Sequence, residues 1–301
     1  MQEAVKVAQN SPFLSWIDFT GGEPADRRDF PEIVCSFLDH CPTLVGVHFS
    51  TNGLKSARVV EVCKRILERR PLQFSVTVSI DGPPEVNDRL RGIRGDFKYA
   101  LKTYLELSWL KGVRVLVGMT LHPENVLLVG ETVREITRLA PNFSYRNLRL
   151  NLAYTSDHYF ENAMHPAVIP KEAVAVIQEF NKKKKVPASI FDLAEKLYMR
   201  RIQRYVETRL CPERCAALLS SIYLSENGTV YPCSVWSEPL GNVRESEYSL
   251  LPLLESDRKK ALRSQLVEKE CANCWHGSEA YCTLGANLKQ VLGRTSERPL
   301  R

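Results

Sequence analysis

The feature that most constrains this fold is an alternation of short apolar runs with amphipathic segments over roughly the first 155 residues. The runs are rich in β-branched residues, and the segments between them repeat apolar residues at helical spacing. Strands joined through helices pair in parallel, so the sequence predicts an α/β fold with a parallel sheet. The predicted strands are Leu14–Phe19, Val45–Phe49, Gln73–Ile80, Val113–Thr120 and Leu148–Ala153, and the predicted helices span 30–40, 55–69, 97–111 and 124–139. These strands read as mostly apolar rather than strictly alternating, as parallel strands do.

Small, polar and glycine residues follow every predicted strand. The segments are Thr20–Pro24, Ser50–Gly53, Ser79–Gly82, Thr120–Asn125 and Tyr154–Asp157. The carboxyl ends of parallel strands form the ligand-binding face of α/β folds. Turn formation alone would explain one or two such segments, because Gly, Asn and Asp are turn residues. Five in succession favour a ligand-binding face at this edge of the sheet.

The nine cysteines are unevenly distributed along the chain. Cys35, Cys41 and Cys63 fall on or beside predicted helices and read as small buried apolar residues. The other six lie within residues 211–282, and such crowding in an intracellular protein indicates a metal site. From the residues alone, zinc and an iron–sulfur cluster are about equally supported, since both are held by sets of four thiolates.

Composition and charge exclude several classes of protein. The chain is 44% apolar and 25% charged, which is ordinary for a globular protein, and no run approaches the length of a membrane helix. The first residues lack the features of a signal peptide, so a cytoplasmic location is expected. A net charge of +6 and a run of lysines at 182–185 without interleaved aromatic residues do not favour a nucleic-acid partner.

The motifs of the first half resemble those of the radical SAM superfamily. Gly21-Gly22-Glu23-Pro24 is similar to the family's GGEP motif, which holds the methionine amino group of S-adenosylmethionine (SAM). The resemblance gives Ser79 a place near the ribose and Arg91 a place at the methionine carboxylate, with Arg89 as its competitor. The implied fold is a partial (β/α)6 parallel barrel without its first strand. The complete set of implied SAM-binding residues is Gly21, Gly22, Glu23, Pro24, Ser50, Asn52, Ser79, Asp81 and Arg91.

The second half is similar to a SPASM or twitch domain, which binds auxiliary iron–sulfur clusters. The similarity rests on Cys215, a hairpin signal at Asn227-Gly228, Cys233, and the pair Cys271 and Cys274. It implies one auxiliary 4Fe–4S cluster held by these four cysteines, and it shifts the balance from zinc to iron–sulfur. Cys211 and Cys282 are further candidate ligands, although the family's usual third cysteine after the C-x-x-C is missing from 275–281. The expected domains are a core at 1–155, linker helices at 156–210, an auxiliary cluster domain at 211–290 and a tail at 291–301.

The sequence departs from the family at one place. A C-x₃-C-x₂-C triad normally precedes the GGEP motif, whereas here no cysteine comes before Cys35. We expect the chain to be a fragment of a complete enzyme rather than a degenerate member, because its SAM-facing loops are intact. A catalytic 4Fe–4S cluster is expected only if a triad is encoded upstream, and the chain as given is not expected to cleave SAM.

For the complete family, the resemblance implies abstraction of a hydrogen atom by a 5′-deoxyadenosyl radical. The substrate would be a peptide or a small molecule, and the electron donor a flavodoxin or ferredoxin; no membrane partner is expected. Tyr154, Asp157, His122 and His158 lie near the predicted open face, but none is assigned a catalytic role. A zinc- or single-cluster-stabilised binding module is the main alternative. An aldolase-like barrel is disfavoured, because no strand end carries a lysine.

Overall fold

The computed structural model describes residues 1–184, 190–268, 271 and 273–287, and it divides the chain into two compact units. Unit 1 comprises Met1–Ala153 together with Ser246–Leu251. Unit 2 comprises Tyr154–Glu245 and the described residues from Pro252 onward. The predicted boundaries at 155 and 210 remain predictions, and the predicted tail at 291–301 lies outside the described residues.

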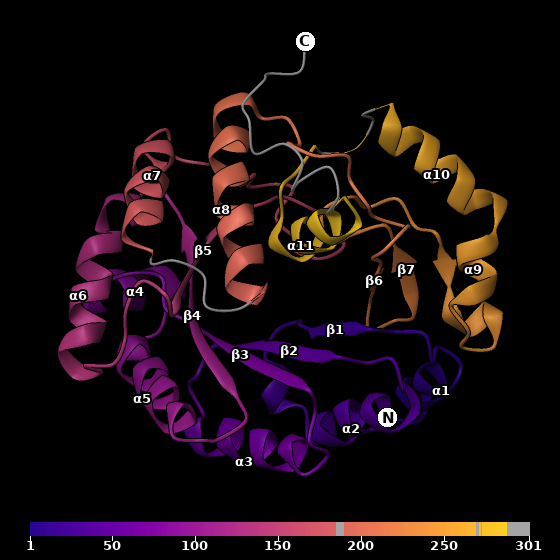
Figure 1. The fold of residues 1–301 in the computed structure, drawn as a ribbon, viewed down its shortest axis with the longest axis horizontal. Helices are drawn as coiled ribbons and strands as arrows, with labels where there is room; N and C mark the ends of the chain where they lie inside the picture. Colours follow the sequence, from indigo (N-terminus) through magenta and orange to yellow (C-terminus); the bar gives the residue numbers. More distant parts are fainter. Residues whose placement is uncertain (185–189, 269–270, 272, 288–301) are drawn as a thin grey trace. The chain divides into compact units, whose positions relative to one another are not determined.

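Unit 1 is built on one sheet of five parallel strands in the order β1-β2-β3-β4-β5 (Figure 1). The strands are β1 (Trp16–Phe19), β2 (Gly46–Thr51), β3 (Gln73–Ser79), β4 (Arg114–Leu121) and β5 (Leu148–Leu152). Its α-helices are α1 (Gln2–Gln9), α2 (Phe30–His40), α3 (Ser56–Leu67), α4 (Pro84–Arg91), α5 (Asp96–Ser108) and α6 (Val129–Leu139), with 3-10 turns η1 (Pro24–Asp26) and η2 (Val126–Leu128). The predicted α/β class is therefore confirmed. Helix α4 was missed because it is short and polar, burying only Asn87.

The two faces of this sheet differ in chemistry, which the sequence analysis did not expect. One face packs on α2 through edge-to-face contacts of Phe30 with Phe19 and Phe49. The opposite face carries polar side chains, and β3 alternates strictly between Phe74, Val76 and Val78 on one side and Ser75, Thr77 and Ser79 on the other. The expectation of mostly apolar strands holds for β4 but not for β3, because only the face that packs on helices requires apolar residues.

One close contact on the polar face yields a stability prediction. The Trp16 ring lies over Gly46 in the neighbouring strand, so a Cβ at Gly46 would fall 1.9 Å from Trp16 Cζ3. We expect Gly46→Ala to lower the free energy of unfolding by about 1–3 kcal/mol, because overpacking forces the indole out of place. Urea denaturation would measure this. Gly130→Ala is the matched control: its Cβ meets nothing closer than 3.8 Å, and in helix α6 we expect it to stabilise by about 0.5–1 kcal/mol. Equal stability of Gly46→Ala and wild type would contradict the packing seen here.

Unit 2 combines helices with a small antiparallel sheet. Its elements are α7 (Ala173–Lys183), α8 (Ile190–Thr208), β6 (Tyr223–Leu224), β7 (Thr229–Tyr231), β8 (Gly241–Asn242), η3 (Val243–Ser246), α10 (Asp257–Val267) and α11 (Gly277–Ala286), with α9 (Leu251–Glu255) beginning at the junction of the two units. The predicted hairpin is formed by β6 and β7. Gly228 occupies its turn with φ of +87°, a backbone conformation that favours glycine.

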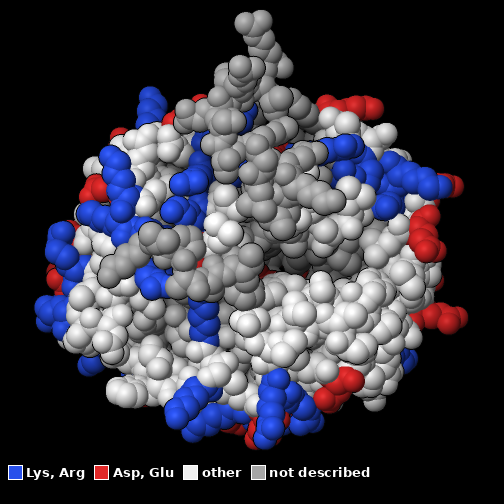
Figure 2. Space-filling model, viewed as in Figure 1, with Lys and Arg blue, Asp and Glu red and all other residues white. Residues whose placement is uncertain are grey.

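The charged surface is mixed rather than concentrated. On the face drawn in Figure 2, Lys and Arg side chains form several separate groups. At the end of α7, Lys183 pairs with Glu179 and Lys184 with Glu195, while Lys185 lies outside the described residues. These lysines are thus engaged in ion pairs within unit 2. None of the described helices combines the length and apolar character needed to cross a bilayer.

Candidate functional site

The glycines of the GGEP segment lie in open space at the carboxyl edge of the sheet. Parallel pairing of β1, β2 and β3 brings the segments that follow them to the same edge. Gly21 has a φ of +129°, a backbone conformation that residues with a side chain rarely adopt. A Cβ atom built at Gly21 or Gly22 would meet no other atom within 4 Å. The backbone of this segment is therefore accessible for close approach by a ligand.

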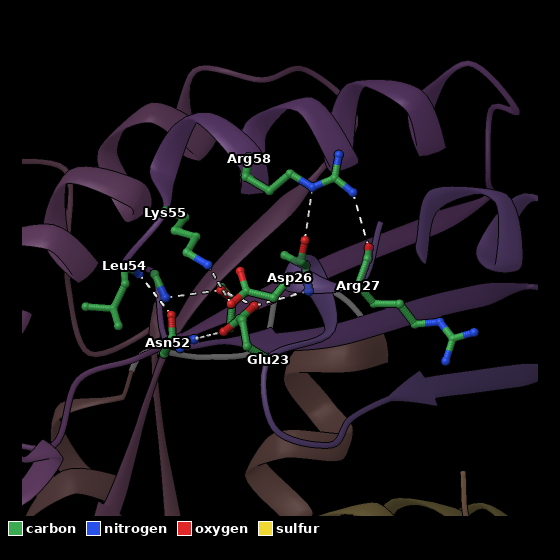
Figure 3. Close-up of polar contacts among 10 residues, drawn as sticks. Glu23, Asp26, Arg27, Asn52, Leu54, Lys55 and Arg58 are labelled. Atoms are coloured by element: carbon green, nitrogen blue, oxygen red, sulfur yellow. Dashed lines mark hydrogen bonds and ion pairs between the residues drawn. The ribbon is translucent and has the colours of Figure 1, made fainter. Parts of the chain in front are cut away.

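The Glu23 carboxylate ties this segment to the end of β2 (Figure 3). Its Oε2 accepts the Asn52 backbone N–H at 2.6 Å, and its Oε1 accepts the Thr51 hydroxyl at 2.9 Å and the Ala25 N–H at 3.3 Å. Burial raises the pKa of Glu23, while the hydrogen bonds from Asn52 and Thr51 oppose that shift. A carboxylate offers about four acceptor positions, so these three bonds leave one for an ammonium group.

Basic side chains of the α3 region hold the other side of the same segment (Figure 3). Arg58 donates to the backbone oxygens of Ala25 and Arg27 at 3.0 and 3.2 Å, and Lys55 pairs with Asp26 at 2.8 Å. The Asn52 side chain accepts the Leu54 N–H at 3.0 Å and so forms a local turn. The segment is thereby positioned before any ligand arrives.

Asp81 and Arg91 form the second part of this edge. Arg91 Nη1 lies 3.1 Å from Asp81 Oδ2, and Asp81 Oδ1 accepts the Thr120 N–H at 2.8 Å. Burial raises the pKa of Asp81, and the charge of Arg91 opposes the shift. The competitor Arg89 instead pairs with Glu124 at 2.9 Å and is largely exposed. Of the two arginines, only Arg91 is held at the end of β3.

Two asparagines that the sequence analysis did not single out hold this edge together. Asn125 donates from its side chain to the backbone oxygens of Asp81 and Thr120, which joins the ends of β3 and β4. Asn87 accepts the Asp81 N–H at 2.7 Å and donates to Asp96. Both are completely buried. Isolated asparagines offer no sequence signal for this role: Asn87 lies within the polar helix α4, and Asn125 lies in a loop, where asparagines commonly form turns.

The polar face of the sheet contains a hydrogen-bonded row across three strands. His48 Nδ1 lies 2.6 Å from Asp18 Oδ1, and His48 Nε2 lies 2.8 Å from Thr77 Oγ1. The sequence analysis assigned none of these residues. The signal that could have revealed them is the alternation of polar residues within strands read as apolar.

In unit 2, five cysteines from three segments line one small cavity of about 20 Å³. The cysteines are Cys211, Cys215, Cys233, Cys271 and Cys274. They include all four predicted ligands and one of the two further candidates. Cys282 is not part of this cavity's described lining, and it forms no disulfide in the described structure. As the side chains stand, no three His, Cys, Asp or Glu groups among the described residues are spaced to hold a single metal ion.

The cavity cysteines are buried, which disfavours the thiolate form in the absence of a metal. Burial raises the pKa of Cys211 to about 12 and raises that of Cys215, Cys233 and Cys274 as well. Against this, backbone hydrogen bonds at Ala217, Val235 and His276 lower the pKa of Cys215, Cys233 and Cys274, whereas the Cys211 thiol donates to the Glu213 carbonyl oxygen at 3.1 Å. Trp236 N also lies 3.3 Å from Cys233 Sγ. Backbone donors aimed at buried sulfurs are what an iron–sulfur cluster requires, since its charge must be stabilised away from water.

A carboxylate that the sequence analysis missed completes the cavity. Glu279 lines it from α11, accepts a hydrogen bond from Ser221, and has its pKa raised by burial to about 7. A glutamate in a helix gives no sequence signal of such burial. Five thiols and one carboxylate form a donor set that fits an iron–sulfur cluster, in which each iron needs only one protein ligand.

A larger cavity of about 260 Å³ adjoins the cysteine cavity. It is lined by Thr155, Ser156, Asp157, Ala163, Val235, Trp236, Ser237 and Glu238, and two of these, Val235 and Trp236, line both cavities. His158 forms hydrogen bonds to one lining residue of each cavity. Its ring nitrogens lie 2.9 Å from Ser237 Oγ in the larger cavity and 3.0 Å from the carbonyl oxygen of Cys233 in the cysteine cavity. Burial lowers the pKa of His158.

Comparison with known proteins identifies the cysteine-rich segment as part of a known domain family. Residues 215–275 match the family model of SPASM, an iron–sulfur cluster-binding domain. The chain is 36% identical over 108 residues, 36% of its length, to an Fe-coproporphyrin III synthase of Methanosarcina barkeri, of which it covers 25%. It is 25% identical over 232 residues, 76% of its length, to the sporulation killing factor maturation protein SkfB of Bacillus subtilis, of which it covers 51%. The chain thus spans between a quarter and about half of these relatives.

A solved structure shares the fold. The chain matches Streptococcus suis SuiB with a TM-score of 0.56 and 13% identity over 87% of this chain and 61% of that one. The parallel sheet and the cysteine-rich segment therefore define an α/β protein with a C-terminal iron–sulfur cluster-binding domain. The comparisons support the resemblance to radical SAM proteins that carry a SPASM domain, and residues 215–275 are the part of the chain that matches that domain.

Proposed function

We propose that this chain binds SAM along the carboxyl edge of β1–β3 and one auxiliary 4Fe–4S cluster in the cysteine cavity, as part of a cytoplasmic oxidoreductase. The observation that carries the proposal of a cluster is the convergence of five cysteines from three segments on one cavity. The expected ligands are Cys215, Cys233, Cys271 and Cys274. A cytoplasmic location agrees with nine free thiols, since reducing compartments keep cysteines unpaired.

In the SAM site, each residue has a distinct part. The open backbone at Gly21 and Gly22 admits the methionine end, and the remaining acceptor position of Glu23 takes its ammonium group. Arg91, held by Asp81, presents its other guanidinium nitrogen to the methionine carboxylate. Ser79 at the end of β3 faces the ribose. Where a catalytic cluster is bound, SAM supplies the radical that abstracts hydrogen from the substrate.

The substrate class remains a peptide or a small molecule. The names of the two relatives indicate different substrates, one the maturation of a killing factor and the other a porphyrin. The 260 Å³ cavity beside the cysteines is the place we assign to the substrate, because it shares Trp236 with them. Its hydroxyls and the exposed carboxylate of Asp157 would orient a polar group. A flavodoxin or ferredoxin would supply electrons.

The proposal is tested by the contents and the ligand binding of the anaerobically purified chain. We expect about four irons and four sulfides per chain, as one cubane requires, and SAM binding by calorimetry. Zinc without iron or sulfide would instead support the metal-stabilised binding module. Iron without measurable SAM binding would contradict the assignment of the edge of β1–β3.

A further inference from the structure

The 260 Å³ cavity of unit 2 has an acidic lining with one carboxylate that no cation of the described chain balances. Its described lining includes Asp157 and Glu238 but no lysine, arginine or histidine. Glu238 pairs with Arg258, whose Nη2 lies 3.0 Å from Glu238 Oε2. The Asp157 carboxylate, in contrast, has neither an ion pair nor a hydrogen bond among the described residues. The cavity therefore offers one unpaired negative charge to a ligand.

The neighbouring residue His158 does not supply the missing partner of Asp157. Its Nδ1 lies 2.9 Å from Ser237 Oγ, and its Nε2 lies 3.0 Å from the carbonyl oxygen of Cys233. Its ring is stacked on that of Tyr231, with the ring centroids 4.1 Å apart. Both ring nitrogens are thus used by other partners, and the Asp157 carboxylate remains available to a cation from outside the chain.

Hydrogen bonds to the hydroxyls of the cavity hold the Asp157 segment in position. The backbone N–H of Asp157 donates to Ser237 Oγ at 3.3 Å, and the backbone N–H of Phe160 donates to Ser156 Oγ at 3.0 Å. Both hydroxyls belong to residues that line the cavity. A carboxylate on a segment that is already ordered loses less conformational freedom when a ligand binds, which favours affinity.

Trp236 adds a second feature that suits a cation. It contributes to the lining of this cavity, and its backbone N–H lies 3.3 Å from Cys233 Sγ, which fixes the position of the residue. The face of an indole ring attracts ammonium and guanidinium groups, and a carboxylate nearby adds an ion pair. A volume of about 260 Å³ is below that of typical sites for drug-sized ligands, so the cavity suits a single side chain or a small amine.

We propose that this cavity binds an ammonium or guanidinium group of the substrate, in an ion pair with Asp157 and beside the indole of Trp236. The inference rests on the proposed function, which assigns the cavity to the substrate, and it narrows that substrate to a cationic one. The lysine or arginine side chain of a peptide and a small free amine share this chemistry.

The test measures binding to the full, anaerobically reconstituted chain by calorimetry with matched probes. The probes are a short acetylated peptide with one lysine among glycines and alanines, the same peptide with norleucine in place of the lysine, and butylamine. We expect the lysine peptide to bind about 10-fold more tightly than the norleucine peptide, and this preference to fall as salt is added. Tighter binding of the peptide than of butylamine identifies a peptide side chain, and the reverse identifies a small amine; both results support a cation site.

Variants of the cavity separate its charge from its shape. Asp157→Asn should remove most of the preference for lysine, because it deletes the charge at nearly constant size, whereas Asp157→Glu should retain the preference. Trp236→Leu should weaken binding of the lysine peptide about 3- to 10-fold. Glu226→Gln, which makes the same change of charge at an exposed position in the β6–β7 turn, is the matched control and should bind like wild type.

The cation site is overturned if wild type binds the lysine and norleucine peptides equally, if neither the lysine peptide nor butylamine binds, or if Asp157→Asn keeps the preference for lysine. Iron content and SAM binding of the same preparations separate this inference from the proposed function. A chain that holds about four irons and binds SAM, yet shows no preference for lysine, contradicts the cationic substrate alone. A chain that prefers lysine but lacks iron and SAM binding refutes the proposed function and supports the cation site.

Discussion

Replacing Cys274 with serine is expected to reduce the iron content of the anaerobically reconstituted chain from about four per chain to fewer than one. Cys274 lines the cysteine cavity, burial raises the pKa of its thiol, and its charge would interact with those of Cys215 and Cys233. A serine hydroxyl is a poor iron ligand, and water cannot replace the thiolate in so buried a position. Iron and sulfide analysis, with the visible absorption of the cluster, would measure the loss.

The same change should also lower the melting temperature of the holo chain. A group that binds only the folded state stabilises it by about 4 kcal/mol when present at a thousand times its dissociation constant, and this contribution disappears with the cluster. Cys63→Ser is the matched control, because Cys63 is also completely buried but lies in α3 of unit 1. It should keep its iron. Retention of iron by Cys274→Ser would remove the basis for the auxiliary cluster.

The sheet could be predicted closely from sequence because its signal is local. The predicted ends of all five strands lie within three residues of the observed ends. Runs of β-branched residues indicate a strand, and the Gly, Asn and Asp residues that bound them indicate the turns where it ends. The polar face of the sheet was missed for a related reason. Ser75 and Thr77 alternate with Val76 and Val78, but a β-branched threonine has high strand propensity and does not interrupt the run that predicts the strand.

The site was predictable only as far as its residues follow a motif. Cys215, Cys233, Cys271 and Cys274 were chosen by spacing, and the structure brings all four to one cavity. No motif spacing predicts that Glu279 lines this cavity, because its position depends on how α11 packs against the Cys215 segment. Likewise, Asp81 was expected beside the ligand, but only the fold reveals that it holds Arg91.

Replacing Glu23 with alanine is expected to lower the free energy of unfolding by about 2–4 kcal/mol. The loss leaves the Asn52 N–H, the Thr51 hydroxyl and the Ala25 N–H without their acceptor, and each buried unsatisfied donor is costly. Glu23→Gln keeps the size of the side chain but turns an amide N–H₂ toward a donor, so we expect a smaller loss of about 1–2 kcal/mol. Glu131→Gln, an exposed change in α6, should stay within about 0.5 kcal/mol of wild type.

Measurements of SAM binding distinguish a ligand role of Glu23 from its structural role. SAM affinity and folding stability are expected to change in opposite directions as the pH passes through the pKa of Glu23. Burial raises the pKa of Glu23 above its ordinary value of 4.5, so the folded chain takes up a proton more readily than the unfolded chain. The stability contributed by that proton is full below pH 4.5 and is lost as pH rises through the raised pKa. SAM affinity should instead fall as pH drops through the same pKa, because a protonated carboxyl binds an ammonium group weakly.

Glu23→Gln should weaken SAM binding about 10- to 100-fold in calorimetry and remove the pH dependence of both stability and SAM affinity that Glu23 causes. A variant that loses stability but keeps both its SAM affinity and its pH dependence would leave Glu23 a structural residue alone.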